Sequence, residues 1–97
     1  MANDPENTAR SWLLNQATPI PIWTFLQATQ LRIKLETGND LAIEVDTRLL
    51  PDGHVEVKAT LGPNVFLWEV DPQRRTFESK TEFTRDFTRL IENTPAP

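Results

Sequence analysis

Few residues in the sequence could do chemistry, and His54 is its single histidine. It follows the turn sequence PDG, where a side chain is usually exposed to solvent. A serine–histidine–carboxylate triad would have to use Ser11, which has no base near it in sequence, or Ser79, which is better explained as a helix cap. The absence of cysteine removes disulfides, thiolate metal sites and cysteine nucleophiles. We predict that the protein is not an enzyme and has no catalytic residue.

Three carboxylates, Glu44, Asp46 and Glu56, are expected on the exposed face of neighbouring strands. Paired carboxylates could do acid–base chemistry or bind a hard cation. However, no DxDxDG loop is present, and alternating acids are expected on any half-buried sheet. The three glycines form neither a GxGxxG nor a GxxxxGK phosphate-binding loop. We predict no metal and no cofactor.

Aromatic and basic residues meet in the stretch WEVDPQRRTF, which places Trp68, Arg74, Arg75 and Phe77 around one turn. Sheet aromatics framed by arginines can stack unpaired bases. Against this, three carboxylates lie within residues 68–78, and a net charge of −4 opposes phosphate binding. Single-stranded RNA or DNA binding is therefore the alternative function.

The stretch PIPIWTF at 19–25 holds two prolines, which make it a stiff strap leading out of a first helix. Residues 22–29 beyond it fit either a short helix or an extended strand, and the periodicity does not decide between them. One interpretation buries Ile20, Ile22 and Trp23 in the core. The other exposes the aromatic side chains as an anchor for a partner.

The stretch VFLWEV at 65–70 predicts a strand that is apolar on both faces. Phe66, Trp68 and Val70 point one way, and Val65 and Leu67 point the other. Such a strand needs cover on both faces, from the N-terminal helix or from a second protomer. We predict a partner-binding patch of Trp23, Phe66 and Trp68 with a charged rim. Trp68→Ala is then expected to weaken association and leave the domain folded.

The 97 residues suffice for one domain, because two cores would each be too small. Its patterns predict an N-terminal helix at 1–18, a Pro-rich connector at 19–30, an antiparallel sheet at 31–78, an amphipathic helix at 79–93 and a tail at 94–97.

Local signals mark both helices and the first hairpin. Asn3 or Asp4 can cap the first helix. Leu31, Ile33 and Leu35 alternate with charged residues, which predicts a strand that turns at TGND. Ser79 and Glu82 predict a capping box. The last helix then has one apolar stripe, expected to lie on the sheet, made of Phe83, Phe87, Leu90 and Ile91.

These elements predict an α+β fold with two layers, in which an antiparallel meander of four to five strands carries an N-terminal and a C-terminal helix. The alternative is a small, bent β-barrel with terminal helices. The order of elements is similar to that of the dimeric chaperones of bacterial secretion and of small immunity-type inhibitors. No motif carries either likeness, and architecture alone does not establish function.

The charge distribution suits binding to another protein. Residues 30–72 are mainly acidic and the end of the chain is slightly basic, a dipole that can dock on a partner or on a second copy. No apolar run approaches the roughly 20 residues that span a bilayer, and the first ten residues do not resemble a secretory signal. We predict a non-enzymatic, cytoplasmic interaction module, adaptor-like or chaperone-like, that binds a protein partner and forms a homodimer.

Overall fold

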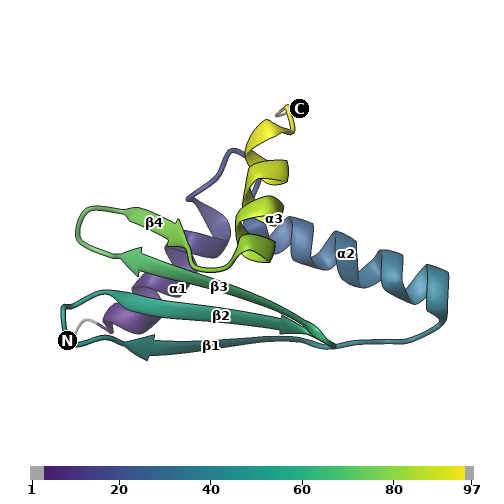
Figure 1. The fold of residues 1–97 in the computed structure, drawn as a ribbon, viewed down its shortest axis with the longest axis horizontal. Coiled ribbons are helices and arrows are strands. Elements are labelled where there is room, and N and C mark those ends of the chain that lie inside the picture. The colour runs from purple at the N-terminus through teal and green to yellow at the C-terminus, as the bar shows by residue number, and fades with distance from the viewer. Residues whose placement is uncertain (1–3, 96–97) are drawn as a thin grey trace.

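The computed structural model describes residues 4–95 and consists of three helices and four strands (Figure 1). Their bounds are α1 Pro5–Asn15, α2 Ile22–Thr37, β1 Ile43–Leu49, β2 Val55–Leu61, β3 Asn64–Asp71, β4 Thr76–Ser79 and α3 Glu82–Asn93. The strands form one antiparallel sheet in the order β1-β2-β3-β4. The α+β prediction is confirmed, and the sheet does not close into the alternative barrel.

Helix α1 begins as the sequence predicts and ends earlier. The Asp4 Oδ1 accepts hydrogen bonds from the backbone N–H groups of Glu6 and Asn7 at 3.1 and 3.2 Å, and Pro5 occupies the first turn. The other proposed cap, Asn3, lies outside the described residues. The helix ends at Asn15 and buries three residues against the sheet: Ala9, Leu13 and Leu14.

Residues 31–37 are the last part of α2, so the strand and hairpin predicted there are wrong. No proline or glycine interrupts the chain from Ile22 to Thr37, and the helix continues until Gly38. Gly38 adopts a φ of 76°, the left-handed conformation that commonly ends a helix. The helical alternative for 22–29 is the one observed, and the predicted connector shrinks to residues 16–21. Neither α2 nor any other helix within residues 4–95 is long and apolar enough to cross a membrane.

The proline strap packs on its own domain. The Thr18 hydroxyl donates a 2.6 Å hydrogen bond to the carbonyl of Ile20 and stabilises the turn. Ile22 is completely buried, and Ile20 and Trp23 are half-buried. The burial interpretation of PIPIWTF therefore describes the strap, although Trp23 keeps some contact with solvent.

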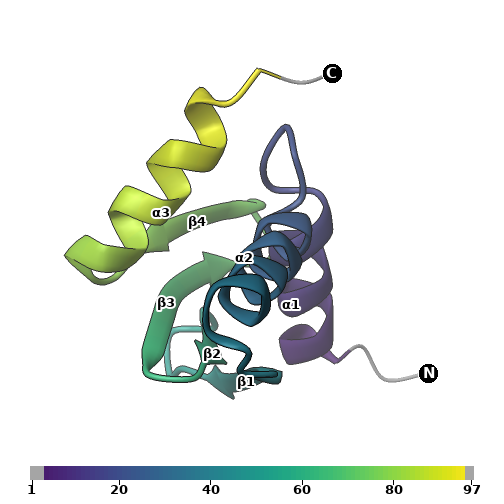
Figure 2. The ribbon, with the colours of Figure 1, turned by 90° about the vertical axis from the view of Figure 1, so that its right-hand side faces the viewer.

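The sheet buries one face. Alternate residues of β2 and β3 point inward, and their partners in register include Val57 opposite Trp68 and Val55 opposite Val70. They form one core with the buried residues of α1, α2 and α3. Figure 2 looks along α2, which lies between α1 and α3. On the other face of β3, Val65 is 45% exposed, so α1 does not supply the second cover there.

Helix α3 begins at Glu82, three residues later than predicted, and its cap is Thr81 instead of Ser79. The Thr81 hydroxyl accepts a 3.1 Å hydrogen bond from the backbone N–H of Thr84. Ser79 is the last residue of β4, and its hydroxyl donates to the Thr88 hydroxyl at 3.2 Å. The predicted capping box is therefore not formed.

The predicted apolar stripe of α3 is not the side that is buried. Of its four members only Ile91 is fully buried, whereas Phe83 and Leu90 are 50% and 61% exposed. Thr84 and Thr88 are buried in their place. The helix is therefore rotated by about a quarter of a turn from the orientation that its apolar residues predict.

Hydrogen bonds from β3 explain the rotation. The backbone N–H of Leu67 donates to the Thr84 hydroxyl at 2.9 Å, and the indole Nε1–H of Trp68 donates to the Thr88 hydroxyl at 3.0 Å. The indole donor is buried and the Leu67 donor is partly buried, and an N–H without an acceptor is costly away from water. Threonines on the inner side of α3 supply those acceptors.

We predict that Thr88→Val lowers the free energy of unfolding by about 1–3 kcal/mol, because the buried indole N–H of Trp68 loses its acceptor while the shape of the side chain is kept. Urea denaturation followed by tryptophan fluorescence measures the change. Thr88→Ser, which retains the hydroxyl, is the matched control and should lose less. A valine variant as stable as the wild type would show that this hydrogen bond does not hold α3 in place.

The burial of Trp68 also reverses the outcome expected from the sequence. We now expect Trp68→Ala to cost about 3–5 kcal/mol through the cavity that it leaves, a large part of the roughly 5–15 kcal/mol that stabilises a typical domain. The same denaturation experiment tests this. A variant that keeps wild-type stability would place Trp68 at the surface after all.

Candidate protein-binding surface

The structure separates the five predicted partner-binding residues. Phe66 and Trp68 lie in the core, 2% and 0% exposed, with stacked rings 6.0 Å apart. Trp23 is half-buried in the first turn of α2, and Arg74 and Arg75 are exposed in the turn between β3 and β4. Phe66 and Trp68 therefore do not form the exposed patch that the sequence predicts, and Trp68 cannot stack a base.

An open groove of about 750 Å³ lies instead between α2 and α3, and we call it the α2–α3 groove. Its apolar lining consists of Phe25 and Ile33 from α2, Phe66 from β3, and Phe83, Phe87 and Leu90 from α3. The sequence does not reveal this site, because residues 31–37 alternate like a strand. The apolar side of residues 83–91 is also expected to face the sheet and not the groove. A continuous helical reading of residues 22–37 was the signal that could have located one wall of the groove.

Aromatic rings connect the groove with the core. The ring centroid of Phe66 lies 4.5 Å from that of Phe87 and 5.1 Å from that of Phe83, within the range of favourable aromatic pairs. Burial of Phe66 fixes the inner ring, whereas Phe83 is half exposed. The groove thus presents an aromatic surface to solvent on a rigid base.

Charged residues of both signs stand at the rim of the groove. Arg32 and Glu36 belong to α2, and Asp86 belongs to α3. All three are exposed, and none of them forms a salt bridge within residues 4–95. Such charges can orient a partner at little desolvation cost.

Exposed apolar residues concentrate on the same two helices. Six large apolar side chains of the described chain are exposed: Leu31, Leu35, Leu49, Val65, Phe83 and Leu90. Four of these six belong to α2 or α3. A concentration of exposed apolar surface is typical of an interaction site, whereas single exposed apolar residues are ordinary.

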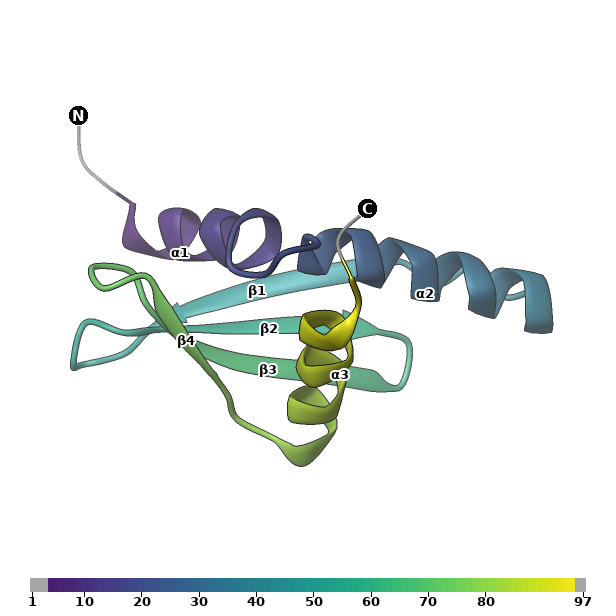
Figure 3. The same ribbon diagram turned by 90° about the horizontal axis from the view of Figure 1, so that it is seen from above.

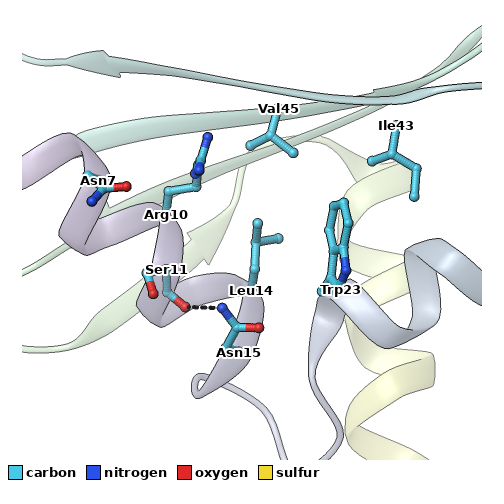
Figure 4. Close-up of a pocket in the computed structure, with 8 residues that line it drawn as sticks. All are labelled: Asn7, Arg10, Ser11, Leu14, Asn15, Trp23, Ile43 and Val45. Carbon is cyan, nitrogen blue, oxygen red and sulfur yellow. Dashed lines mark hydrogen bonds between the residues drawn. The ribbon is translucent and has the colours of Figure 1, made fainter.

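Trp23 lines a second, smaller cleft, of about 420 Å³, between α1, the start of α2 and β1 (Figure 4). The residues around it are Asn7, Arg10, Ser11, Leu14, Asn15, Trp23, Ile43 and Val45. The indole ring points between Leu14 and Ile43, and the polar side chains of α1 line the other side (Figure 4). The side-chain amide of Asn15 donates a 3.0 Å hydrogen bond to the carbonyl of Ser11. Trp23 thus faces its own domain and lines this cleft.

Carboxylates dominate the sheet face that points away from the core: Glu44, Asp46, Glu56, Glu69, Asp71 and Glu78. Glu69 lies directly opposite both Glu56 and Glu78, an arrangement that like charges disfavour. Arg48 pairs with Glu56 at 3.2 Å, and Lys80 lies 3.9 Å from Glu69. Of the three carboxylates singled out from the sequence, Glu56 has this arginine and Asp46 faces a lysine in register. Glu44 faces Thr60, so this face is neutralised only in part and stays acidic.

His54 joins this face just before β2. Its Nδ1 lies 2.8 Å from Glu69 Oε2, and carboxylate oxygens of Asp52 and Asp71 lie 3.5 and 3.6 Å from the ring nitrogens. The hydrogen bond with Glu69 raises the pKa of His54 above its ordinary value, and the charges of the two aspartates add to this effect. The alternation of residues 55–61 and 65–70 on either side of the turn GPN was the signal that could have brought residues 54 and 69 together.

The ligand atoms of Asp52, His54 and Glu69 lie within 4.8 Å of one another and could hold a divalent cation. A protonated His54 that hydrogen-bonds to Glu69 satisfies the same groups, so the geometry does not require a metal. Neither Ser11 nor Ser79 hydrogen-bonds to His54 in the described part of the chain, where Ser79 contacts Thr88 instead.

Comparisons of the chain with protein families, with curated proteins and with solved structures found no match. Function must therefore be inferred from the surfaces themselves. Among these, the α2–α3 groove combines volume, aromatic lining and unpaired rim charges.

We predict that NMR titration of the His54 ring gives a pKa above 6.5 and that Glu69→Gln lowers it, because the main cause of the shift is removed. A proton bound more tightly in the folded state stabilises the fold. This contribution is complete below pH 6.5 and is lost as the pH rises through the folded pKa.

Urea denaturation on either side of this window, at about pH 5.5 and about pH 8.5, gives the second readout. His54→Gln should remove the His54-dependent part of the difference. A His54 pKa that Glu69→Gln leaves unchanged would contradict the assignment of Glu69 as its main partner.

Proposed function

We propose that the protein binds another protein by taking an apolar helical segment of its partner into the α2–α3 groove. The observation that supports this function is the composition of the groove, in which Phe83 and Leu90 are half exposed above the buried ring of Phe66. Removal of such surface from water contributes about 25 cal/mol per Å². Grooves between helices commonly receive the apolar side of an amphipathic helix.

The proposed class of protein is the one predicted from the sequence, but the binding surface is the α2–α3 groove and not a patch around Trp68. The protein is an interaction module without catalytic function, adaptor-like or chaperone-like, and cytoplasmic. Its anchors are the exposed Phe83 and Leu90 in place of Trp68. The rim charges Arg32, Glu36 and Asp86 set the orientation of the bound segment.

Single-stranded nucleic acid binding has weaker support. Of the residues that suggested it, Trp68 is buried, and Arg74 lies 3.8 Å from the carboxylate of Asp71. The sheet face on which bases would stack is mainly acidic. Only Arg75 remains as an exposed cation without a salt bridge among the residues that suggested this function in the described chain.

A photo-crosslinking amino acid at position 90, introduced in the cells that naturally make the protein, tests the proposal. We expect an adduct with a protein, because Leu90 lines the groove and its side chain is 61% exposed. Position 65 is the matched control, since Val65 is 45% exposed on the far side of the sheet. Mass spectrometry identifies the adduct. Equal yields at both positions, or no protein adduct at position 90, would contradict the proposed function.

A further inference from the structure

We propose that the helical segment filling the α2–α3 groove is α2 of a second copy of this chain, so that the protein forms a two-fold symmetric dimer. This inference rests on the proposed function of the groove and names its occupant. It is carried by the apolar side that α2 leaves uncovered, by the position of that side next to the groove, and by the charges at the rim.

The second half of α2 is covered only in part by the rest of the described chain, and its outer side is exposed. The buried residues of this helix, Ile22 and Leu26, both lie in its first turns. Farther along, Leu31 and Leu35 are 55% and 78% exposed. Figures 1 and 3 show this half projecting beyond the ends of the strands, where the sheet cannot reach it. Several polar residues favour a helix about as well as leucine does. Helix propensity alone therefore does not explain leucines at exposed positions.

The exposed leucines form a ridge beside the groove. Ala28, Leu31 and Leu35 follow a spacing of three and then four residues, so they line one side of the helix, as in a helix–helix seam. Ala28 also lines the groove, so the ridge and the groove are continuous. Helix α2 is thus apolar on its inner side and on this outer side, a pattern typical of a helix that is covered on more than one side.

In a dimer with two-fold symmetry, both chains contribute this same surface to the contact. In an isologous contact the ridge of each chain lies in the groove of the other, and both halves of the apolar surface are covered at once. The small side chain of Ala28 lies where ridge and groove meet, which allows two α2 helices to approach closely. A single helix that filled only the groove would leave Leu31 and Leu35, which are exposed in the single chain, without cover.

The charges at the rim suit a contact between identical surfaces. Arg32 is positive, and Glu36 and Asp86 are negative, so a symmetric contact can pair Arg32 with a carboxylate of the other chain. The outward face of the sheet lacks this property, because its carboxylates outnumber its basic residues and two such faces would repel each other. Of the two surfaces, the one with apolar residues is also the one that can bind a copy of itself.

Light scattering coupled to size-exclusion chromatography of the purified protein tests the inference. At about 100 μM, well above the dissociation constant of an ordinary stable dimer, we expect twice the chain mass of 11.1 kDa. The double variant Leu31→Asp, Leu35→Asp should halve that mass. Both side chains are exposed in the single chain, so circular dichroism and urea denaturation should show an intact fold. Leu49→Asp is the matched control at an exposed leucine outside this surface and should remain dimeric.

The absence of cysteine from the sequence permits a second readout. Leu35→Cys treated with a short bis-maleimide linker should give a covalent dimer, whereas Val65→Cys should give little. A wild-type protein that is monomeric at this concentration, or a dimer that the Leu31 and Leu35 substitutions leave intact, would overturn the inference. A position-90 adduct with a different protein would then still support the proposed function, and the absence of any adduct would overturn both.

Discussion

Two hydrogen bonds from β3 to α3 determine which side of α3 meets solvent. Leu67 directly precedes Trp68, the first residue of β3 that pairs with β4, so its N–H needs another acceptor. The indole N–H of Trp68 needs an acceptor in the core. Each unsatisfied donor would cost about 1–3 kcal/mol, similar to the 1.5–3 kcal/mol gained by burying one large apolar side chain. Satisfying both donors with Thr84 and Thr88 therefore outweighs turning Leu90 inward.

The α2–α3 groove follows from this rotation. Once the threonines face β3, Phe83 and Leu90 must lie on the side of α3 that faces α2, and Phe66 supports them from the core. The uncovered half of α2 adds Leu31 and Leu35 next to them. The carboxylates occupy the opposite, outward face of the sheet, where water and salt screen their repulsion. Charge and apolar surface are thus separated onto two sides of one small domain.

The sequence predicts the sheet well and α2 poorly, for a physical reason. In β2, apolar residues alternate with polar ones that include Glu56 and Lys58. The charged side must face water, so Val55 and Val57 point into the core. In residues 31–36 the same alternation occurs on a helix, because leucines four residues apart satisfy a helical period as well as a strand period. Tertiary and capping contacts decide the outcome: the side-chain amide of Gln30 donates to the carbonyl of Leu41 at 2.6 Å, and Gly38 ends the helix.

The groove was harder to predict than the fold because it depends on polar atoms that pattern analysis counts as surface. The sequence pattern predicts Thr84 and Thr88 at the surface. Their burial follows from the hydrogen-bond donors of β3 that lie beside them. The proximity of His54 and Glu69 could be predicted from the two alternating strands on either side of the turn GPN. No periodicity, in contrast, identifies a buried threonine. A helix whose apolar residues point toward solvent conflicts with packing inside one chain. In the proposed dimer a second chain covers these residues and resolves the conflict, whereas the outward sheet face is mainly acidic and needs no such cover.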